Sequence, residues 1–175
     1  EHDACGVGIV ADILGRKSHR MVESGLEVLD NLAHRGAAGS DPDTGDGGGM
    51  LLQMPHELFR RECAAQGITL PDSGEYGVGM IFLPQDPQER LACEGVVEET
   101  VKAEGQRLLG WRDVPVDNTE IGYTARAAEP VIRQVFVERG SHTRDQDAFE
   151  RKLYVIRKVI ESGVQGLGGH AARTF

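Results

Sequence analysis

The sequence predicts an α+β fold, because segments typical of strands alternate with segments typical of amphipathic helices. Three segments carry this prediction most clearly. Tyr76–Leu83 is uncharged, Val131–Glu138 places Ile132, Gln134 and Phe136 on one face, and Asp145–Ser162 repeats apolar residues at helical spacing. A chain of 175 residues is long enough for one domain with a substantial core. The alternation by itself leaves the sheet topology open.

The N-terminal elements are expected in the order strand, turn, helix. Gly6–Ile13 predicts a largely buried strand, and Gly15-Arg16-Lys17 predicts the turn after it. Ser18 can then cap a helix that ends at Arg35-Gly36, where glycine favours the left-handed conformation. The apolar stripe of this helix consists of Met21, Val22, Leu26, Leu29 and Ala33.

A loop over residues 37–49 is expected to lead into a strand at Met50–Met54. Pro55 fits the first turn of a short helix with Leu58 and Phe59 on its inner face. Tyr76–Leu83 is then expected as a strand buried on both faces, followed by a helix from Asp86-Pro87 with Leu91, Val97 and Val101 inward. Two more strands are expected, Leu108–Val116 and Val131–Glu138. The last expected element is a helix, Asp145–Ser162, whose inward residues are Phe149, Leu153, Ile156, Val159 and Ile160.

The composition argues against several classes of partner. The net charge is -9, from 19 Lys+Arg against 28 Asp+Glu, which disfavours nucleic acid and anionic membrane surfaces. The sequence shows neither an apolar run long enough to span a bilayer nor a secretory signal. Three widely spaced cysteines fit a reducing compartment, so a cytoplasmic location is expected. Neither the cysteines nor the six scattered histidines have the spacing of a metal site.

Cys5 is the candidate nucleophile. If the four preceding residues were removed, the thiol and a free α-amine would belong to one residue, and the amine could serve as general base for the thiol. The pKa of an α-amine is near ~7.7–8.0, so a useful fraction is unprotonated at neutral pH. From the residues alone, a small buried hydrophobic side chain in a strand is the commoner role for such a cysteine.

Two further motifs lie near Arg35. The Arg35 guanidinium could favour a thiolate and pair with a carboxylate, although Arg35-Gly36 also fits an ordinary helix terminus. Thr44–Gly49 is glycine-rich but lacks the Gly-Lys-Ser/Thr ending of a phosphate loop and runs into a predicted strand. We therefore expect a tight loop near the active site, with Asp46 as a turn residue, rather than a nucleotide site.

Five motifs follow one another in order. They are Cys5-Gly6-Val7-Gly8, Leu32-Ala33-His34-Arg35-Gly36-Ala37, Thr44–Gln53, Tyr76–Pro84 and Gly110–Val116. In this order and spacing, the segment from Cys5 to about Ile160 resembles the start of the glutamate synthase large (alpha) subunit, the part that forms its class II glutamine amidotransferase domain. Each motif alone is short and would occur in many proteins, so it is the ordered series of five motifs that makes the resemblance specific.

The resemblance implies the N-terminal nucleophile (Ntn) hydrolase fold, a four-layer α/β/β/α sandwich, present here only in part. It implies that a leader, residues 1–4, is removed and that residues 5–175 are the start of the amidotransferase domain. Cys5 would then attack the side-chain amide of L-glutamine, release ammonia and leave a thioester for water to cleave. Arg35 and Gly36 would position the nucleophile and the bound glutamine.

The resemblance also implies cofactors and partners outside this segment. No cofactor is expected within these residues, whereas FMN and a 3Fe-4S cluster are expected in the full-length protein. The remaining synthase domains are expected partners, together with a small reductase subunit. The electron donor, NADPH, NADH or ferredoxin, is not encoded here.

The chain departs from the family pattern at its C-terminus, where the family continues with an Arg-containing segment that binds glutamine and with an Asn-Gly pair. The family forms its oxyanion hole with an Asn-Gly pair, but neither Asn31 nor Asn118 is followed by glycine. Loss of one oxyanion donor costs about 10²–10³ in rate. We therefore expect a truncated, poorly soluble and inactive fragment. Two other hypotheses for the function of this chain are open. One is a different N-terminal cysteine amidohydrolase, and the other is a non-catalytic remnant that at most binds other subunits.

Overall fold

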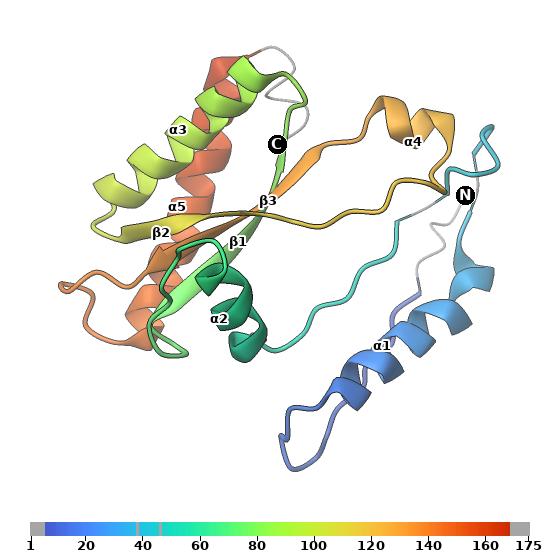
Figure 1. The fold of residues 1–175 in the computed structure, drawn as a ribbon, viewed down its shortest axis with the longest axis horizontal. Coiled ribbons are helices and arrows are strands. Elements are labelled where there is room, and N and C mark those ends of the chain that lie inside the picture. Colours follow the sequence, from blue (N-terminus) through green and yellow to red (C-terminus); the bar gives the residue numbers. More distant parts are fainter. Residues whose placement is uncertain (1–5, 38, 46, 169–175) are drawn as a thin grey trace. The chain divides into compact units, whose positions relative to one another are not determined.

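The computed structural model describes residues 6–37, 39–45 and 47–168. The chain divides into two compact units, each with its own elements (Figure 1). We call them the N-terminal unit, which comprises Glu1–Pro55 and Asp117–Ala128, and the sheet unit, which comprises His56–Val116 and Glu129–Phe175.

The sheet unit is built on a three-stranded antiparallel sheet in the order β1-β3-β2. Its strands are β1 (Tyr76–Leu83), β2 (Arg107–Asp113) and β3 (Val131–Glu138). The central strand β3 pairs with β1 along the full length of both strands. It also pairs with β2, with an irregularity between Leu108 and Gly110. The outer edges of β1 and β2 are therefore unpaired among the described strands.

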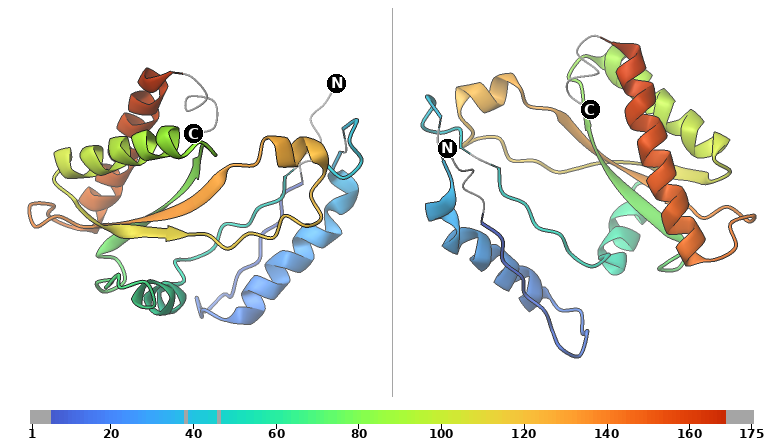
Figure 2. Two further views of the ribbon diagram at one scale, coloured as in Figure 1. Left: turned by 45° about the horizontal axis from the view of Figure 1, so that its top comes forward. Right: turned by 180° about the vertical axis from the view of Figure 1, so that it is seen from behind.

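Two long helices, α3 (Pro87–Ala103) and α5 (Gln146–Leu167), cover one face of this sheet (Figure 2). Side chains alternate between the faces of a strand, so every second residue of β1 and β3 points toward these helices. The core between helices and sheet consists of Leu83, Cys93, Val97, Val101, Val135, Val137, Ile156, Ile160 and Val164. Trp111 packs against this core, and its indole N–H donates to the Glu98 carboxylate at 3.0 Å.

Both helices begin at an aspartate. The Asp86 carboxylate accepts the backbone N–H groups of Gln88 and Glu89, both at 2.9 Å. The Asp145 carboxylate accepts the N–H of Ala148 at 2.8 Å. The first N–H groups of a helix have no partner within the helix, so these carboxylates satisfy groups that would otherwise need water. This capping explains why the sequence signals located both helix starts.

The short helix α2 (His56–Ala64) packs on the opposite face of the sheet. The rings of Phe59 and Phe136 pack edge-on, with their centroids 5.4 Å apart. The Tyr76 hydroxyl and the His56 ring nitrogen share a hydrogen bond of 3.0 Å. Farther along this face Met80 is 50% exposed. Nine helical residues span only about 14 Å, whereas eight strand residues span about 27 Å. The prediction that β1 is buried on both faces is therefore wrong toward its C-terminal end.

The N-terminal unit contains α1 (His19–Asn31), the short 3-10 helix η1 (Ala33–Arg35) and α4 (Tyr123–Ala127). None of the residues of α1 is buried, although its apolar stripe is present. The chain after the glycine-rich loop is tied to the start of this unit, because the ammonium group of Lys17 donates to the Met54 carbonyl at 3.3 Å.

The predicted strands at Gly6–Ile13 and Met50–Met54 are wrong, because neither segment is a strand in the structure. Their apolar side chains are exposed, with Ile9 at 90% and Leu51 at 100%. A strand needs a neighbour to accept and donate its backbone hydrogen bonds, and no other described strand pairs with either segment. Apolar composition signalled burial here, but burial requires a partner surface.

Several smaller expectations are also corrected; among them, Leu58, predicted on the inner face of α2, is 45% exposed. The helix α1 was expected to end at Arg35-Gly36, but it ends at Asn31 and η1 follows it. Gly36 has φ -78° and ψ 157°, so this glycine does not adopt the left-handed conformation. The tighter 3-10 turn η1 therefore follows the end of α1 in place of a left-handed glycine. Leu91, on α3, is 69% exposed, and Val159, on α5, is 43% exposed; both lie off the faces that meet the sheet.

The structure confirms the mixture of helices and strands that the sequence predicts, and it shows that the sheet is antiparallel. The bounds of β1 and β3 coincide with the predicted strands. The four-layer sandwich remains a proposal, to which the sheet unit would contribute one sheet and one helical layer. No helix among the described residues is long and apolar enough to cross a membrane.

Replacing Asp86 by alanine removes both capping hydrogen bonds of α3. We expect a loss of about 1 kcal/mol in the free energy of unfolding, measured by urea denaturation of the protein. Asp72→Ala, at an exposed turn residue of the same unit, is the control. Equal stability of the two variants would contradict the capping role of Asp86.

The chain expressed alone is expected to self-associate, because the uncharged strand β1 has an unpaired edge beside exposed Met80 and Phe82. Met80→Lys places a charge on this edge strand and should increase the monomer fraction in size-exclusion chromatography. Leu91→Lys, at an exposed helical site, should change it much less. A monodisperse wild-type chain with a sharp cooperative melt would rule out this expectation.

Candidate active site

Arg35 and Gly36 lie where η1 ends. The backbone N–H of Arg35 donates to the Leu32 carbonyl at 2.8 Å, and that of Gly36 donates to the Ala33 carbonyl at 3.1 Å. His34 bonds through its ring nitrogen to the Asn31 carbonyl at 2.8 Å, which completes the end of α1. Arg35 and Gly36 are both exposed, so this turn presents them at the surface of the N-terminal unit.

The segment that follows the candidate nucleophile lies against α1 and the turn after it. Cys5 itself, like Asp46, lies outside the described residues. A Cβ atom at Gly6 would come within 2.9 Å of a Leu32 methyl group, and one at Gly8 would clash with Val28. A side chain at Gly8 would displace Val28, and one at Gly6 would require the Leu32 side chain to shift, so glycine favours this close approach of the backbone. The residue next to Cys5 is therefore held against Leu32, three positions before Arg35.

The sequence contained a signal for this contact, which was the pair of glycines flanking Val7. Glycine has no side chain, so such a pair permits close approach of the backbone, but a sequence pattern does not name the surface that the backbone approaches. The contact with α1 is decided by the tertiary structure of the N-terminal unit.

The loop after Gly36 closes on itself. The Gly39 N–H donates to the Thr44 carbonyl at 3.2 Å, so the two ends of the turn lie together. Asp41, inside this turn, is only 3% exposed. Its carboxylate accepts the Thr44 hydroxyl at 2.7 Å and the backbone N–H of Thr124 at 2.9 Å. The loop predicted over residues 37–49 is confirmed for these residues, whereas Asp41 was not singled out from the sequence.

The charge of Asp41 is stabilised where it lies. The N–H of Thr124 lowers the pKa of the Asp41 carboxyl below its ordinary value more than any other contact, and the Thr44 hydroxyl lowers this pKa further. Burial acts in the opposite direction. The carboxylate therefore remains ionised at neutral pH as a hydrogen-bond acceptor and is not a proton donor.

The other two cysteines lack the surroundings of a nucleophile. Cys63 and Cys93 are free thiols with no exposed surface. Burial raises the pKa of both thiols, so little reactive thiolate is present near neutral pH. They belong to the packing of the sheet unit.

The described residues do not form a site for an iron-sulfur cluster. No group of three or more His, Cys, Asp or Glu side chains among them could hold a metal ion. The 3Fe-4S cluster expected in the full-length family protein would need thiolate ligands, and Cys63 and Cys93 lie buried in separate helices, α2 and α3. The residues described here therefore do not fit such a cluster.

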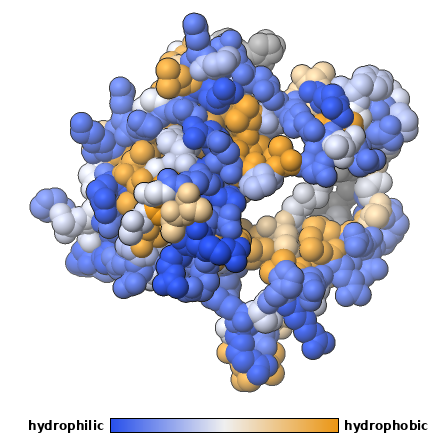
Figure 3. All heavy atoms as spheres, in the orientation of Figure 1, coloured by the Kyte–Doolittle hydropathy of each residue, from blue (hydrophilic) through white to orange (hydrophobic). Residues whose placement is uncertain are grey.

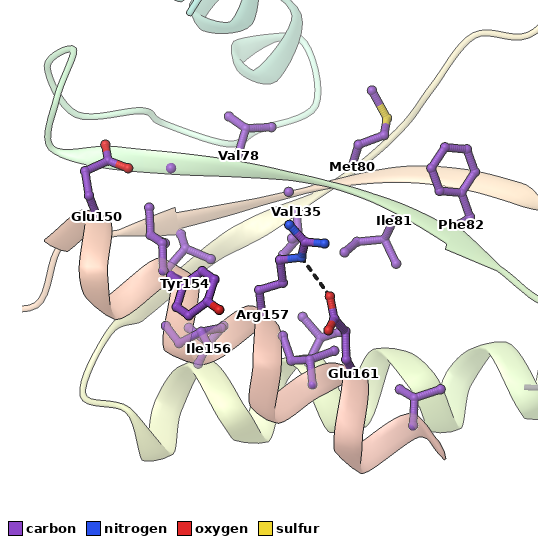
Figure 4. A pocket seen from close by; sticks show the side chains of 18 of the residues that line it. Val78, Met80, Ile81, Phe82, Val135, Glu150, Tyr154, Ile156, Arg157 and Glu161 are labelled. Atoms are coloured by element: carbon purple, nitrogen blue, oxygen red, sulfur yellow. Dashed lines mark hydrogen bonds and ion pairs between the residues drawn. The ribbon is translucent and has the colours of Figure 1, made fainter. Parts of the chain in front are cut away.

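A groove of about 830 Å³ lies between β1 and α5 (Figure 4). Its walls include Val135, Ile156 and Tyr154, and Arg157 pairs with Glu161 along the helix at 2.7 Å. Other apolar side chains are visible at the surface of the molecule (Figure 3). The groove is mainly an uncovered flank of the core and lacks a nucleophile beside a base, so it is a weaker catalytic candidate than the Arg35 turn.

Comparison with known proteins identifies the family. A sequence model of the class II glutamine amidotransferases matches residues 5–173. The chain is 49% identical over 162 residues to the large chain of the NADPH glutamate synthase of Bacillus subtilis, covering 93% of this chain and 10% of that protein. It is 39% identical over 160 residues to ferredoxin-dependent glutamate synthase 2 of Synechocystis, covering 91% of this chain and 10% of that protein.

A plant relative shows the same pattern. The chain is 40% identical over 164 residues to the chloroplastic ferredoxin-dependent glutamate synthase 2 of Arabidopsis thaliana, covering 94% of this chain and 10% of that protein. The chain thus spans about a tenth of the length of the curated relatives that it matches. The family match over nearly the whole chain, together with these identities, confirms the resemblance seen in the motif series. The chain belongs to the class II glutamine amidotransferases.

Proposed function

We propose that this chain carries the nucleophile-bearing part of the glutaminase of a glutamate synthase. The observation that carries this proposal is the family match, which begins at Cys5, together with relatives that are glutamate synthases. The substrate is L-glutamine, and the products are ammonia and glutamate.

Cys5 acts as nucleophile once residues 1–4 have been removed. Its α-amine takes the thiol proton, and the thiolate sulfur attacks the side-chain amide carbon of glutamine. The carbon–nitrogen bond then breaks, and the leaving nitrogen takes the proton from the amine and departs as ammonia. Water cleaves the γ-glutamyl thioester, which releases glutamate and restores the thiol.

Arg35 and Gly36 position the nucleophile and the bound glutamine. The contact between Gly6 and Leu32 supports this assignment, because it brings the residue beside Cys5 to the turn that carries Arg35. A guanidinium is always charged and offers a planar pair of donors to a carboxylate. It can therefore bind the α-carboxylate of glutamine and favour the thiolate form of Cys5.

In the longer protein, the released ammonia is used to form glutamate from 2-oxoglutarate. FMN and a 3Fe-4S cluster belong to that protein's remaining domains and supply its electron transfer, and no step at Cys5 uses them. The relatives include NADPH-dependent and ferredoxin-dependent enzymes, so either donor is compatible with this segment.

The full-length protein should show a mature N-terminus at Cys5 by intact mass and should take up one diazo-ketone glutamine analogue there. Cys5→Ala should lower glutamine hydrolysis by about 10³-fold or more and should abolish the label. Label that persists in Cys5→Ala would rule out the assigned nucleophile. An unprocessed, unlabelled wild-type protein would favour a non-catalytic remnant.

A matched control comes from the two buried thiols. Because burial raises the pKa of Cys63 and Cys93, neither should react with iodoacetamide at pH 7.5 while the protein is folded. Both should react after unfolding in urea, as peptide mass mapping can show. Fast labelling of Cys63 in the folded protein would contradict the burial of its thiol.

A further inference from the structure

A buried carboxylate joins two segments of the N-terminal unit that are far apart in the sequence. Asp41 lies in the loop after Gly36, and Thr124 lies in the first turn of α4. Their hydrogen bond spans 83 positions of sequence. Asp41 is almost fully buried, and a buried carboxylate is costly unless hydrogen bonds replace its water. The bonds from Thr44 and Thr124 meet that requirement.

Two further hydrogen bonds reinforce the junction. The N–H of Gly122 donates to the Asp43 carbonyl at 3.0 Å. The N–H of Ala125 donates to the Thr44 hydroxyl oxygen at 3.3 Å. The Thr44 hydroxyl therefore donates to Asp41 and accepts from α4 at the same time. We call residues 41–44 with 122–125 the Asp41 junction.

Gly122 is the point of closest approach in this junction. A Cβ atom there would clash with both the Thr44 hydroxyl and the Asp41 carboxylate. Its φ lies outside the left-handed region, so the requirement for glycine is one of space. A single added methyl group at Gly122 would therefore separate the two segments while leaving the carboxylate itself unchanged.

The Asp41 junction restrains the loop that follows Arg35-Gly36. Only four residues separate Gly36 from Asp41, and Asp41 lies inside the turn that the hydrogen bond from Gly39 to Thr44 closes. Anchoring Asp41 to α4 therefore restricts the direction in which the backbone leaves the Arg35 turn. No described contact of the Asp41 carboxylate reaches Arg35 or Gly36 directly.

We propose that Asp41 is a positioning residue of the glutamine site, which fixes the backbone at Arg35-Gly36 by tying its loop to α4. This inference rests on the proposed function, since it assumes that Arg35 contacts glutamine. Asp41 acts through the backbone and exchanges no proton with the substrate. Misplacement of a binding group by about 1 Å can cost 10²-fold in catalysis, so the effect is measurable.

The test is glutamine hydrolysis by the full-length protein with Asp41→Ala and, separately, Gly122→Ala. Both variants should raise KM for glutamine about tenfold or more, because Arg35 is displaced. Asp41→Asn keeps one acceptor oxygen and should fall between Asp41→Ala and the wild type. A variant that merely unfolds part of the population would lower the apparent kcat and leave KM unchanged.

Two control variants separate the effect of the Asp41 junction from the effect of losing any carboxylate or adding any methyl group. Asp30→Asn removes a carboxylate from an exposed position of α1. Gly95→Ala adds a methyl group to α3 where, apart from the backbone of that helix and the two neighbouring residues, no described atom lies within 4 Å. Neither should change KM. If Asp41→Ala fails to fold, Gly122→Ala and Thr44→Val decide the question, because they disturb the same junction and keep the carboxylate.

The inference is overturned if KM for Gly122→Ala and for the folded Asp41 variants stays within about twofold of the wild type. Failure of the proposed function is a different observation, namely glutamine hydrolysis that survives Cys5→Ala. Hydrogen exchange gives a second readout: residues 39–45 and 122–125 should exchange faster together in Gly122→Ala, while β3 stays protected.

Discussion

The pairing of β3 with both of its neighbours organises the sheet unit. β3 is the central strand, and its two faces meet different partners, α3 and α5 on one side and α2 on the other. Val135 and Val137 therefore enter the helical core, while Phe136 between them meets Phe59 of α2. If β3 shifted by one residue, every one of these side chains would move to the wrong face.

The N-terminal unit depends on close backbone approach rather than on a large core. Gly6 and Gly8 let the segment after Cys5 lie directly on α1, and Gly122 lets α4 reach the loop that contains Asp41. α1 has no buried residue of its own, so such contacts define its surroundings. The candidate site is thus built from turns and loops held by glycine contacts and one buried carboxylate, a common arrangement for functional residues.

Local signals in the sequence predicted the elements that rest on local physics. The capping aspartates at residues 86 and 145 located two helix starts, and the uncharged and alternating runs located β1 and β3. Expectations that needed a partner surface failed. Gly6–Ile13 and Met50–Met54 are apolar, but no described strand pairs with them. Burial of a strand depends on its neighbours, which a single segment does not specify.

The sequence by itself determined the family, through a motif series that begins at Cys5, and the position of Arg35-Gly36 as candidate binding residues. The tertiary structure alone decided that Gly6 packs on Leu32 and that Asp41 bonds across 83 positions to Thr124. The physical reason is that motifs record which residue types the chemistry requires. Contacts between distant segments depend on how the chain folds back on itself, and no local pattern around Asp41 encodes that path.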